Sequence, residues 1–181
     1  TQAATITVPK SISDATINVA GLLNAPSDGN VETDALPALT ITADTSISTT
    51  PVKVEIPGGT TIKAPAGWGG TINVPTVQAN DTVTVTPDQG KTATIKAVIE
   101  IGYGDTPLIF SKAIKLVLPG QAGKDVGYYQ NGKFTKITFV CQENSQAWAD
   151  ANLPDGGEGR MDVNGDLVIW TKHFTKYVIY E

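Results

Sequence analysis

The chain has 181 residues, only 17% of which are charged, and its 13 basic and 18 acidic side chains give a net charge of −5. The lysines and arginines stand singly along the sequence, which argues against nucleic acid or an anionic membrane as a partner. No apolar run approaches the roughly 20 residues of a membrane-spanning helix, so membrane insertion is not predicted.

Short stretches that alternate apolar and polar residues follow one another, and threonine and valine, which favour strands, are abundant. They predict strands at residues 5–8, 15–20, 38–42, 52–56, 60–64, 70–74, 81–86, 92–102, 108–110, 113–118, 126–130, 134–140, 161–163 and 166–180. In residues 52–56 the valines and the isoleucine share one face, and Lys53 and Glu55 share the other. This alternation is typical of a strand with one buried face.

Two dipeptides predict tight hairpins. Asn131-Gly132 and Asn164-Gly165 each separate two expected strands, and both suit a type I′ turn, which needs positive φ at its two central residues. The one expected helix is short, spans residues 143–153 and is ended by Pro154. The sequence therefore predicts an all-β, antiparallel sandwich of two sheets with one short helix near residues 143–153.

Residues 24–34 form a polar, loop-like stretch, but the sequence predicts no sharp domain boundary there. Residues 1–44 are predicted to supply N-terminal strands that pack on the same sandwich as residues 45–181, because an isolated hairpin is barely stable in water.

Cys141 is the only cysteine, which excludes an internal disulfide framework. With a single histidine in the chain, it also excludes the usual four-ligand zinc site. We interpret Cys141 as a small buried apolar residue, with an intermolecular disulfide as the open alternative. We predict no metal site and no cofactor.

Acidic residues in two regions suggest calcium binding as an alternative to the absence of a metal site. Asp162, Asn164 and Asp166 alternate as in a calcium loop, but Leu167 and His173 stand where an EF-hand has its glycine and its glutamate. We therefore interpret this segment as a hairpin turn. Calcium between the acidic loops of residues 28–34 and 155–158 stays a weaker alternative.

The triplet His173-Phe174-Thr175 carries the sharpest chemical hypothesis. Strand alternation puts His173 and Thr175 on one face and Phe174 on the other, so a base and a hydroxyl lie on the same side. The Thr175 hydroxyl could attack the Phe174 carbonyl, and the ester formed by this N-to-O acyl shift would then be hydrolysed. Such a reaction also needs local backbone strain.

The segment DLVIWTKHFTKYVIYE (166–181) resembles the end of the ZU5 and GAIN-like β-sandwich domains of bacterial surface proteins. The segments LIFSKAIKLVLPG (108–120) and DVGYYQNGKFTKI (125–137) are similar to the strands that precede it in that family, and PVKVEIPGGTTI (51–62) is similar to its opening strand pair. The resemblance covers residues 45–181. It implies self-cleavage between Phe174 and Thr175, with His173 as the base or orienting group and Thr175 as the nucleophile.

The function predicted on these grounds is a structural or adhesive module of a secreted or cell-surface prokaryotic protein, with a self-cleaving Phe174–Thr175 bond as its possible chemistry. Any catalysis would be intramolecular and single-turnover, and no substrate-processing enzyme is predicted. The expected partners are other domains of a surface protein, copies of the chain itself, or cell-wall and extracellular glycans. One cysteine, one methionine and 24 threonines fit an extracellular prokaryotic protein.

Two alternatives stay open. In the first, the chain is a filament or surface-layer subunit, and the strand within Thr1–Lys10 pairs with the open sheet edge of a neighbour. In the second, the chain is a carbohydrate-binding module that uses Trp68. This tryptophan lies in the loop PAGWGG (65–70), and its glycine neighbours are expected to leave the ring exposed.

Overall fold

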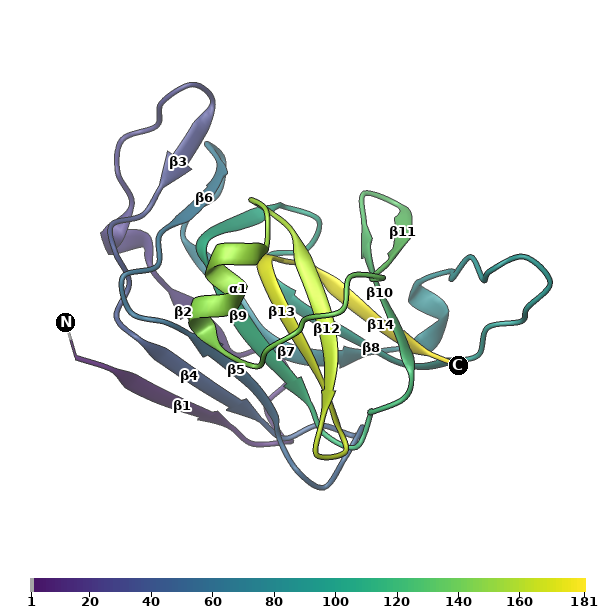
Figure 1. Cartoon of the computed structure of the whole chain (residues 1–181). Coiled ribbons are helices and arrows are strands. Elements are labelled where there is room, and N and C mark those ends of the chain that lie inside the picture. The colour runs from purple at the N-terminus through teal and green to yellow at the C-terminus, as the bar shows by residue number, and fades with distance from the viewer. Residues whose placement is uncertain (1) are drawn as a thin grey trace.

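The computed structural model describes residues 2–181, which fold into two packed β-sheets and one α-helix within that range (Figure 1). In chain order the elements are β1 (Ala4–Val8), β2 (Thr16–Asn18), η1 (Ala20–Leu22), β3 (Asn30–Glu32), β4 (Leu39–Ala43), β5 (Val52–Ile56), β6 (Ile62–Pro65), β7 (Thr71–Gln78), η2 (Asn80–Thr82), β8 (Ile95–Gly102), β9 (Leu108–Leu118), β10 (Asp125–Gln130), β11 (Lys133–Lys136), α1 (Gln146–Asn152), β12 (Glu158–Val163), β13 (Asp166–Phe174) and β14 (Lys176–Tyr180).

The protein is an all-β sandwich. Within residues 2–181, the larger sheet has eight strands, six of them in the order β1-β4-β5-β9-β13-β12, and β6 joins it through β9 and carries β3. The smaller sheet has six strands in the order β11-β10-β14-β8-β7-β2. The expected antiparallel pairing is wrong at one place, because β1 runs parallel to β4.

The strands of the N-terminal region are distributed over both sheets. β1 and β4 lie at one edge of the larger sheet, where β4 pairs with β5. β2 pairs with β7 at one edge of the smaller sheet, and β3 pairs with β6. Segments from the first 43 residues therefore extend both layers of the sandwich.

The main core lies between the two sheets, and period-two alternation places side chains in it. In β5, Val52, Val54 and Ile56 are buried and the two charged residues between them are half-buried, as predicted. A second apolar cluster lies on the outer face of the larger sheet, where Val168 and Trp170 pack against Ala149 and Leu153 of the α1 region.

Helix α1 is slightly shorter than the predicted helix and is fixed at both ends. Ser145 caps its N-terminus, since the Trp148 amide donates to the Ser145 hydroxyl at 3.3 Å. The Asp150 carboxylate accepts the Ala113 amide at 2.7 Å and so ties the helix to β9. The buried Lys172 donates to the Asp150 and Leu153 carbonyls at 3.2 and 2.8 Å, near the C-terminal end of the helix.

Both predicted hairpin turns are confirmed. Asn131 and Gly132 have φ of 52° and 74°, and Asn164 and Gly165 have φ of 51° and 89°. A third turn of this kind, at Asp28-Gly29, lies inside the stretch that the sequence predicted as loop, just before β3.

The strand predicted at residues 81–86 is wrong. Asn80–Thr82 forms a 3₁₀ turn, and the segment after it pairs with no strand among the described residues. The alternation of its valines reflects packing instead of strand pairing, because Val83 packs on Val98 of β8 and Val178 of β14. The segment therefore covers a face of the smaller sheet instead of extending it.

Several strand boundaries also differ from the prediction; β7, for example, extends to Gln78, and β12 begins at Glu158. Residues 108–118 form one strand, and the pairing of β11 ends at Lys136 instead of residue 140. The long strand predicted at residues 166–180 is divided at Thr175, with β13 in the larger sheet and β14 in the smaller one.

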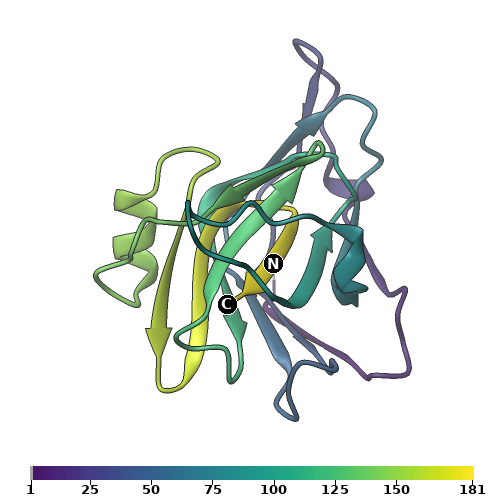
Figure 2. The ribbon, with the colours of Figure 1, turned by 90° about the vertical axis from the view of Figure 1, so that its right-hand side faces the viewer.

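The β3–β6 strand pair projects from the body of the sandwich. β6 pairs with β9 at Ile62 and Lys63 only, and its residues from Lys63 to Pro65 pair with β3. The ribbon shows this strand pair standing away from the rest of the larger sheet in both views (Figures 1 and 2).

Candidate functional site

The triplet His173-Phe174-Thr175 lies where the chain passes from one sheet to the other. Phe174 pairs with Leu108 in the larger sheet, and Lys176 pairs with Glu100 and Tyr129 in the smaller one. Thr175 alone joins the two strands, and its carbonyl accepts the Ile101 amide at 3.1 Å. All three side chains of the triplet are buried.

Phe174 anchors this crossing in the main core. Its ring packs edge-on against Phe110 of β9, with ring centroids 4.5 Å apart. Gly102, at the end of β8, has φ of 106°, and a Cβ on it would lie 2.8 Å from the Phe174 Cβ. The crossing therefore requires glycine at this position, both for the positive φ and for the close approach.

His173 forms a buried pair with Glu158 of β12. Its Nε2 lies 2.9 Å from Glu158 Oε2, and the two side chains are only 4% and 15% exposed. The Tyr128 ring of β10 packs edge-on against the imidazole at a centroid distance of 4.9 Å. A tautomer that donates from Nε2 to the carboxylate leaves Nδ1 as an acceptor.

A second group of polar atoms fixes the backbone just before the triplet. The register of β13 against β9 shifts between Thr171 and His173, so a bulge lies at this point. The His173 amide donates to the Thr171 hydroxyl at 3.1 Å, and the Tyr177 hydroxyl lies 2.9 Å from the His173 carbonyl and 3.0 Å from Thr171 Oγ1. Burial raises the pKa of the Tyr177 hydroxyl well above its usual range, so it stays a donor.

Thr175 makes its side-chain hydrogen bond to β10. Its hydroxyl donates to the Tyr129 carbonyl at 2.8 Å, and Tyr129 follows the Tyr128 that packs on His173. The two outer residues of the triplet thus contact neighbouring residues of β10, while Phe174 packs on β9.

The base and the nucleophile are not hydrogen-bonded to each other within residues 2–181, because the imidazole is paired with Glu158 and the hydroxyl with Tyr129. An attack by Thr175 requires its hydroxyl to leave the Tyr129 carbonyl. The strain expected for self-cleavage is also not found as a positive φ or a cis peptide bond at residues 173–175.

Sequence reasoning missed the contacts that Glu158, Thr171 and Tyr177 make with His173. The predicted Asn164-Gly165 turn contains a signal for Glu158. Counting back along the two strands of that hairpin places residue 158 opposite residue 171, which is two residues before His173. No local signal identifies Thr171 and Tyr177 as a pair, because the chain changes sheets between them.

The expectation of an exposed Trp68 is wrong. The side chain is only 3% exposed and belongs to the main core. The Trp68 amide donates to the Pro65 carbonyl at 2.9 Å, and its indole Nε1 donates to the Thr71 carbonyl at 2.8 Å. The loop thus turns back on itself and buries the ring, which leaves no flat aromatic surface for a sugar at this position.

The acidic residues near Asn164 serve the local fold. Asp162 accepts the Gly123 amide and Asp166 accepts the Gly120 amide, both at 2.9 Å, so the two carboxylates hold the loop after β9. Across residues 2–181, no three histidine, cysteine, aspartate or glutamate side chains gather as they would around a metal ion.

Cys141 is buried, as predicted, and forms no disulfide within the described chain. Burial raises the pKa of its thiol to about 11. The thiol therefore stays protonated at neutral pH, which makes it a poor nucleophile.

None of the helices in residues 2–181 has the length and apolar character needed to cross a bilayer. A scan against protein-family models finds no matching family, and a search of curated proteins finds no match. The resemblance to ZU5 and GAIN-like domains therefore stays a prediction.

Proposed function

We propose that this chain is a structural module of a secreted or cell-surface prokaryotic protein. The observation that carries the proposal is the position of the last two strands. β13 lies between β9 and β12 in one sheet, β14 lies between β10 and β8 in the other, and Thr175 alone connects them. The two sheets therefore cannot separate without breaking strand pairs inside one of them. This resistance to separation suits a module that is exposed to mechanical force or to proteases.

An insertion experiment tests this interlocking. Two glycines inserted between Phe174 and Thr175 should uncouple the sheets, while the same insertion between Gly90 and Lys91 falls in an exposed loop and serves as the control. We expect faster unfolding in urea and faster thermolysin digestion for the first variant than for the control. Equal rates for the two insertions would refute the interlocking role.

The location is tested separately on cells of the source organism. Antibodies raised against the folded chain should label intact cells or their culture medium, and external protease should remove the surface label. A signal that appears only after lysis would refute the secreted or surface location.

Self-cleavage is a second candidate, and the burial of His173 and Thr175 beside β10 favours it. Thr175 Oγ1 would bond to the Phe174 carbonyl carbon while its proton passes to a base, for which His173 is the candidate. The C–N bond would then break, the Thr175 nitrogen would take up a proton, and water would hydrolyse the ester to a Phe174 carboxylate and a free Thr175 hydroxyl.

The products would stay together, because β14 is held on both sides by β10 and β8. The last residue adds two hydrogen bonds to this hold, since the Thr94 and Glu181 backbones pair at 2.7 and 3.1 Å. Cleavage would therefore be invisible in a native size measurement.

Intact mass spectrometry under denaturing conditions tests self-cleavage. Two fragments that sum to the chain plus one water, absent in Thr175→Ala and more abundant in Thr175→Ser, would support it. The serine control is informative because it lacks the β-methyl group that restricts χ1. A single uncut mass in the wild type and in Thr175→Ser would refute it.

Self-assembly through the N-terminal strand is a third candidate. Thr1 lies outside the described residues, but β1 forms an edge of the larger sheet and is mostly exposed. A chain lacking residues 1–10 should lose any concentration-dependent polymerisation seen by light scattering. A wild-type chain that stays monomeric at all concentrations would refute this candidate.

A further inference from the structure

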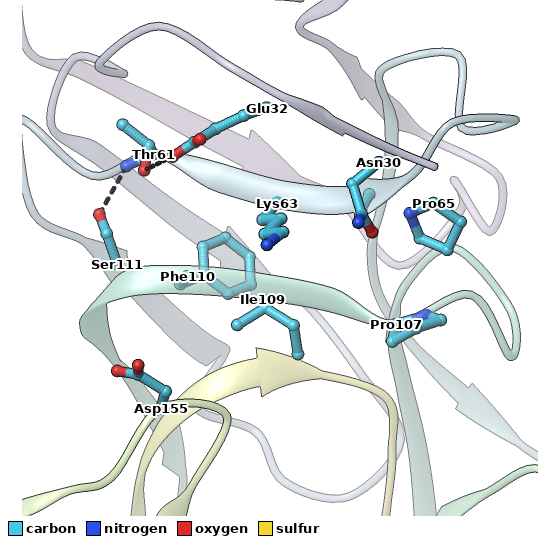
Figure 3. Close-up of a pocket in the computed structure, with 11 residues that line it drawn as sticks. Asn30, Glu32, Thr61, Lys63, Pro65, Pro107, Ile109, Phe110, Ser111 and Asp155 are labelled. Carbon is cyan, nitrogen blue, oxygen red and sulfur yellow. Dashed lines mark hydrogen bonds between the residues drawn. The ribbon is translucent and has the colours of Figure 1, made fainter. Parts of the chain in front are cut away.

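A hollow of about 540 Å³ lies between the projecting β3–β6 strand pair and the body of the larger sheet (Figure 3). It exists because β6 leaves β9 after Lys63 and continues along β3 instead. The wall on the side of the β3–β6 pair carries Asn30, Glu32 and Lys63, and the wall on the body side carries Ile109 and Asp155. Its volume is within the range of small-molecule sites.

Several polar groups in this hollow are free to bind. The side chains of Lys63 and Asp155 take part in no hydrogen bond or ion pair within residues 2–181. Asn30 donates from Nδ2 to the Asp28 carbonyl at 3.1 Å, which leaves its amide oxygen available. Glu32 accepts the Thr61 hydroxyl through Oε1 at 3.0 Å, and its second oxygen has no such partner.

The apolar part of the lining lies beside these groups. Figure 3 shows Lys63 and Ile109 near the middle of the hollow, Glu32 and Asp155 on its opposite walls, and Pro65 and Pro107 at one end. A ligand in this space would meet one ammonium and two carboxylates together with proline and isoleucine carbons.

We propose that this hollow binds a neutral saccharide unit. Each sugar hydroxyl both donates and accepts, so the hydroxyls of a saccharide can donate to the Glu32 and Asp155 carboxylates and accept from the Lys63 ammonium. The C–H groups of the ring can contact the apolar side of the hollow. Two carboxylates beside one lysine disfavour a phosphate or another polyanion.

This site differs from the one that the sequence suggested. The sugar contact expected at Trp68 needed an exposed ring, whereas the hollow uses charged and amide side chains on elements that only the fold brings together. The inference does not depend on cleavage at Phe174, so the two can fail separately.

Titration followed by ¹H–¹⁵N NMR tests the proposal, with cellotetraose, chitotetraose, xylotetraose and mannotetraose as probes. The variants Lys63→Met and Asp155→Asn remove one charged group each. Their controls are Lys133→Met and Asp81→Asn, which change exposed residues outside the hollow. The amide spectra of the free variants also report whether each one folds.

We expect at least one probe to shift the amides of residues 30–32, 63–64, 108–111 and 155. Lys63→Met and Asp155→Asn should each weaken that binding about tenfold, as expected for loss of a charge-assisted hydrogen bond, and the controls should not. The proposal is overturned if none of the four probes shifts these amides or if the two hollow variants bind as well as the controls. The dipeptide glycylglycine serves as a zwitterionic probe. If it shifts these amides and none of the saccharides does, the proposal is also overturned, since the ligand would then be zwitterionic.

Discussion

Replacing Tyr177 with phenylalanine removes one buried hydroxyl and nothing else. The side chain is fully buried, and its hydroxyl lies 2.9 Å from the His173 carbonyl and 3.0 Å from Thr171 Oγ1. These contacts tie β14 to the bulge of β13 across the crossing between the sheets. Tyr177→Phe should therefore destabilise the protein without altering its packing.

The size of the effect follows from what the substitution leaves behind. Losing one partner of a buried hydrogen bond costs about 1–3 kcal/mol. The Thr171 hydroxyl lies 2.9 Å from the same His173 carbonyl and can still donate to it, so we expect the lower part of that range, about 1–2 kcal/mol. For a chain of this length that corresponds to a fall in Tm of about 3–6 °C.

Urea unfolding followed by circular dichroism measures this difference, and Tyr128→Phe is the matched control. Tyr128 pairs with Tyr177 across β10 and β14, but its hydroxyl makes no hydrogen bond within residues 2–181. We expect Tyr128→Phe to change the unfolding free energy by less than about 0.5 kcal/mol. With Thr171→Val, Tyr177→Phe should also show a coupling energy above about 0.5 kcal/mol.

The reasoning would be refuted if Tyr177→Phe and Tyr128→Phe had the same stability. Purely additive effects of Tyr177→Phe and Thr171→Val would refute the network between the two strands, even if each single change is destabilising.

Three further predictions concern the core and its thiol. Gly70→Ala should cost more than Gly90→Ala in urea unfolding, because both glycines have positive φ but only at Gly70 would a Cβ lie 2.6 Å from the Ala20 backbone; equal costs would contradict the clash. Phe174→Ala should lower the unfolding free energy by about 3–5 kcal/mol, and a loss below about 1 kcal/mol would contradict its place in the core. The Cys141 thiol keeps its proton in the native state up to a pKa of about 11, against 9.0 without burial, so the unfolded state loses that proton first. The unfolding free energy should therefore fall as pH rises from 9.0 to about 11, and Cys141→Ala should show a smaller fall over the same range.

The local patterns of the sequence determined most of the secondary structure. Asn131-Gly132 and Asn164-Gly165 predict their hairpins because few other residues tolerate positive φ at both central positions. The alternation in β5 predicts its buried face because successive side chains of a strand point to opposite sides. Both signals are contained in a few adjacent residues.

Only the tertiary structure decided which strands pair and which side chains they bring together. Residues 166–180 have the pattern of a single strand, and they are divided at Thr175 because the partners on either side belong to different sheets. The valines of residues 81–86 alternate as in a strand but pack on the face of the smaller sheet, and the glycine-rich loop around Trp68 folds the ring into the core. The pairing of His173 with Glu158 and the hollow beside Lys63 depend in the same way on register and on where β6 leaves β9. These features depend on contacts between residues far apart in the chain, whereas period and turn chemistry depend only on near neighbours.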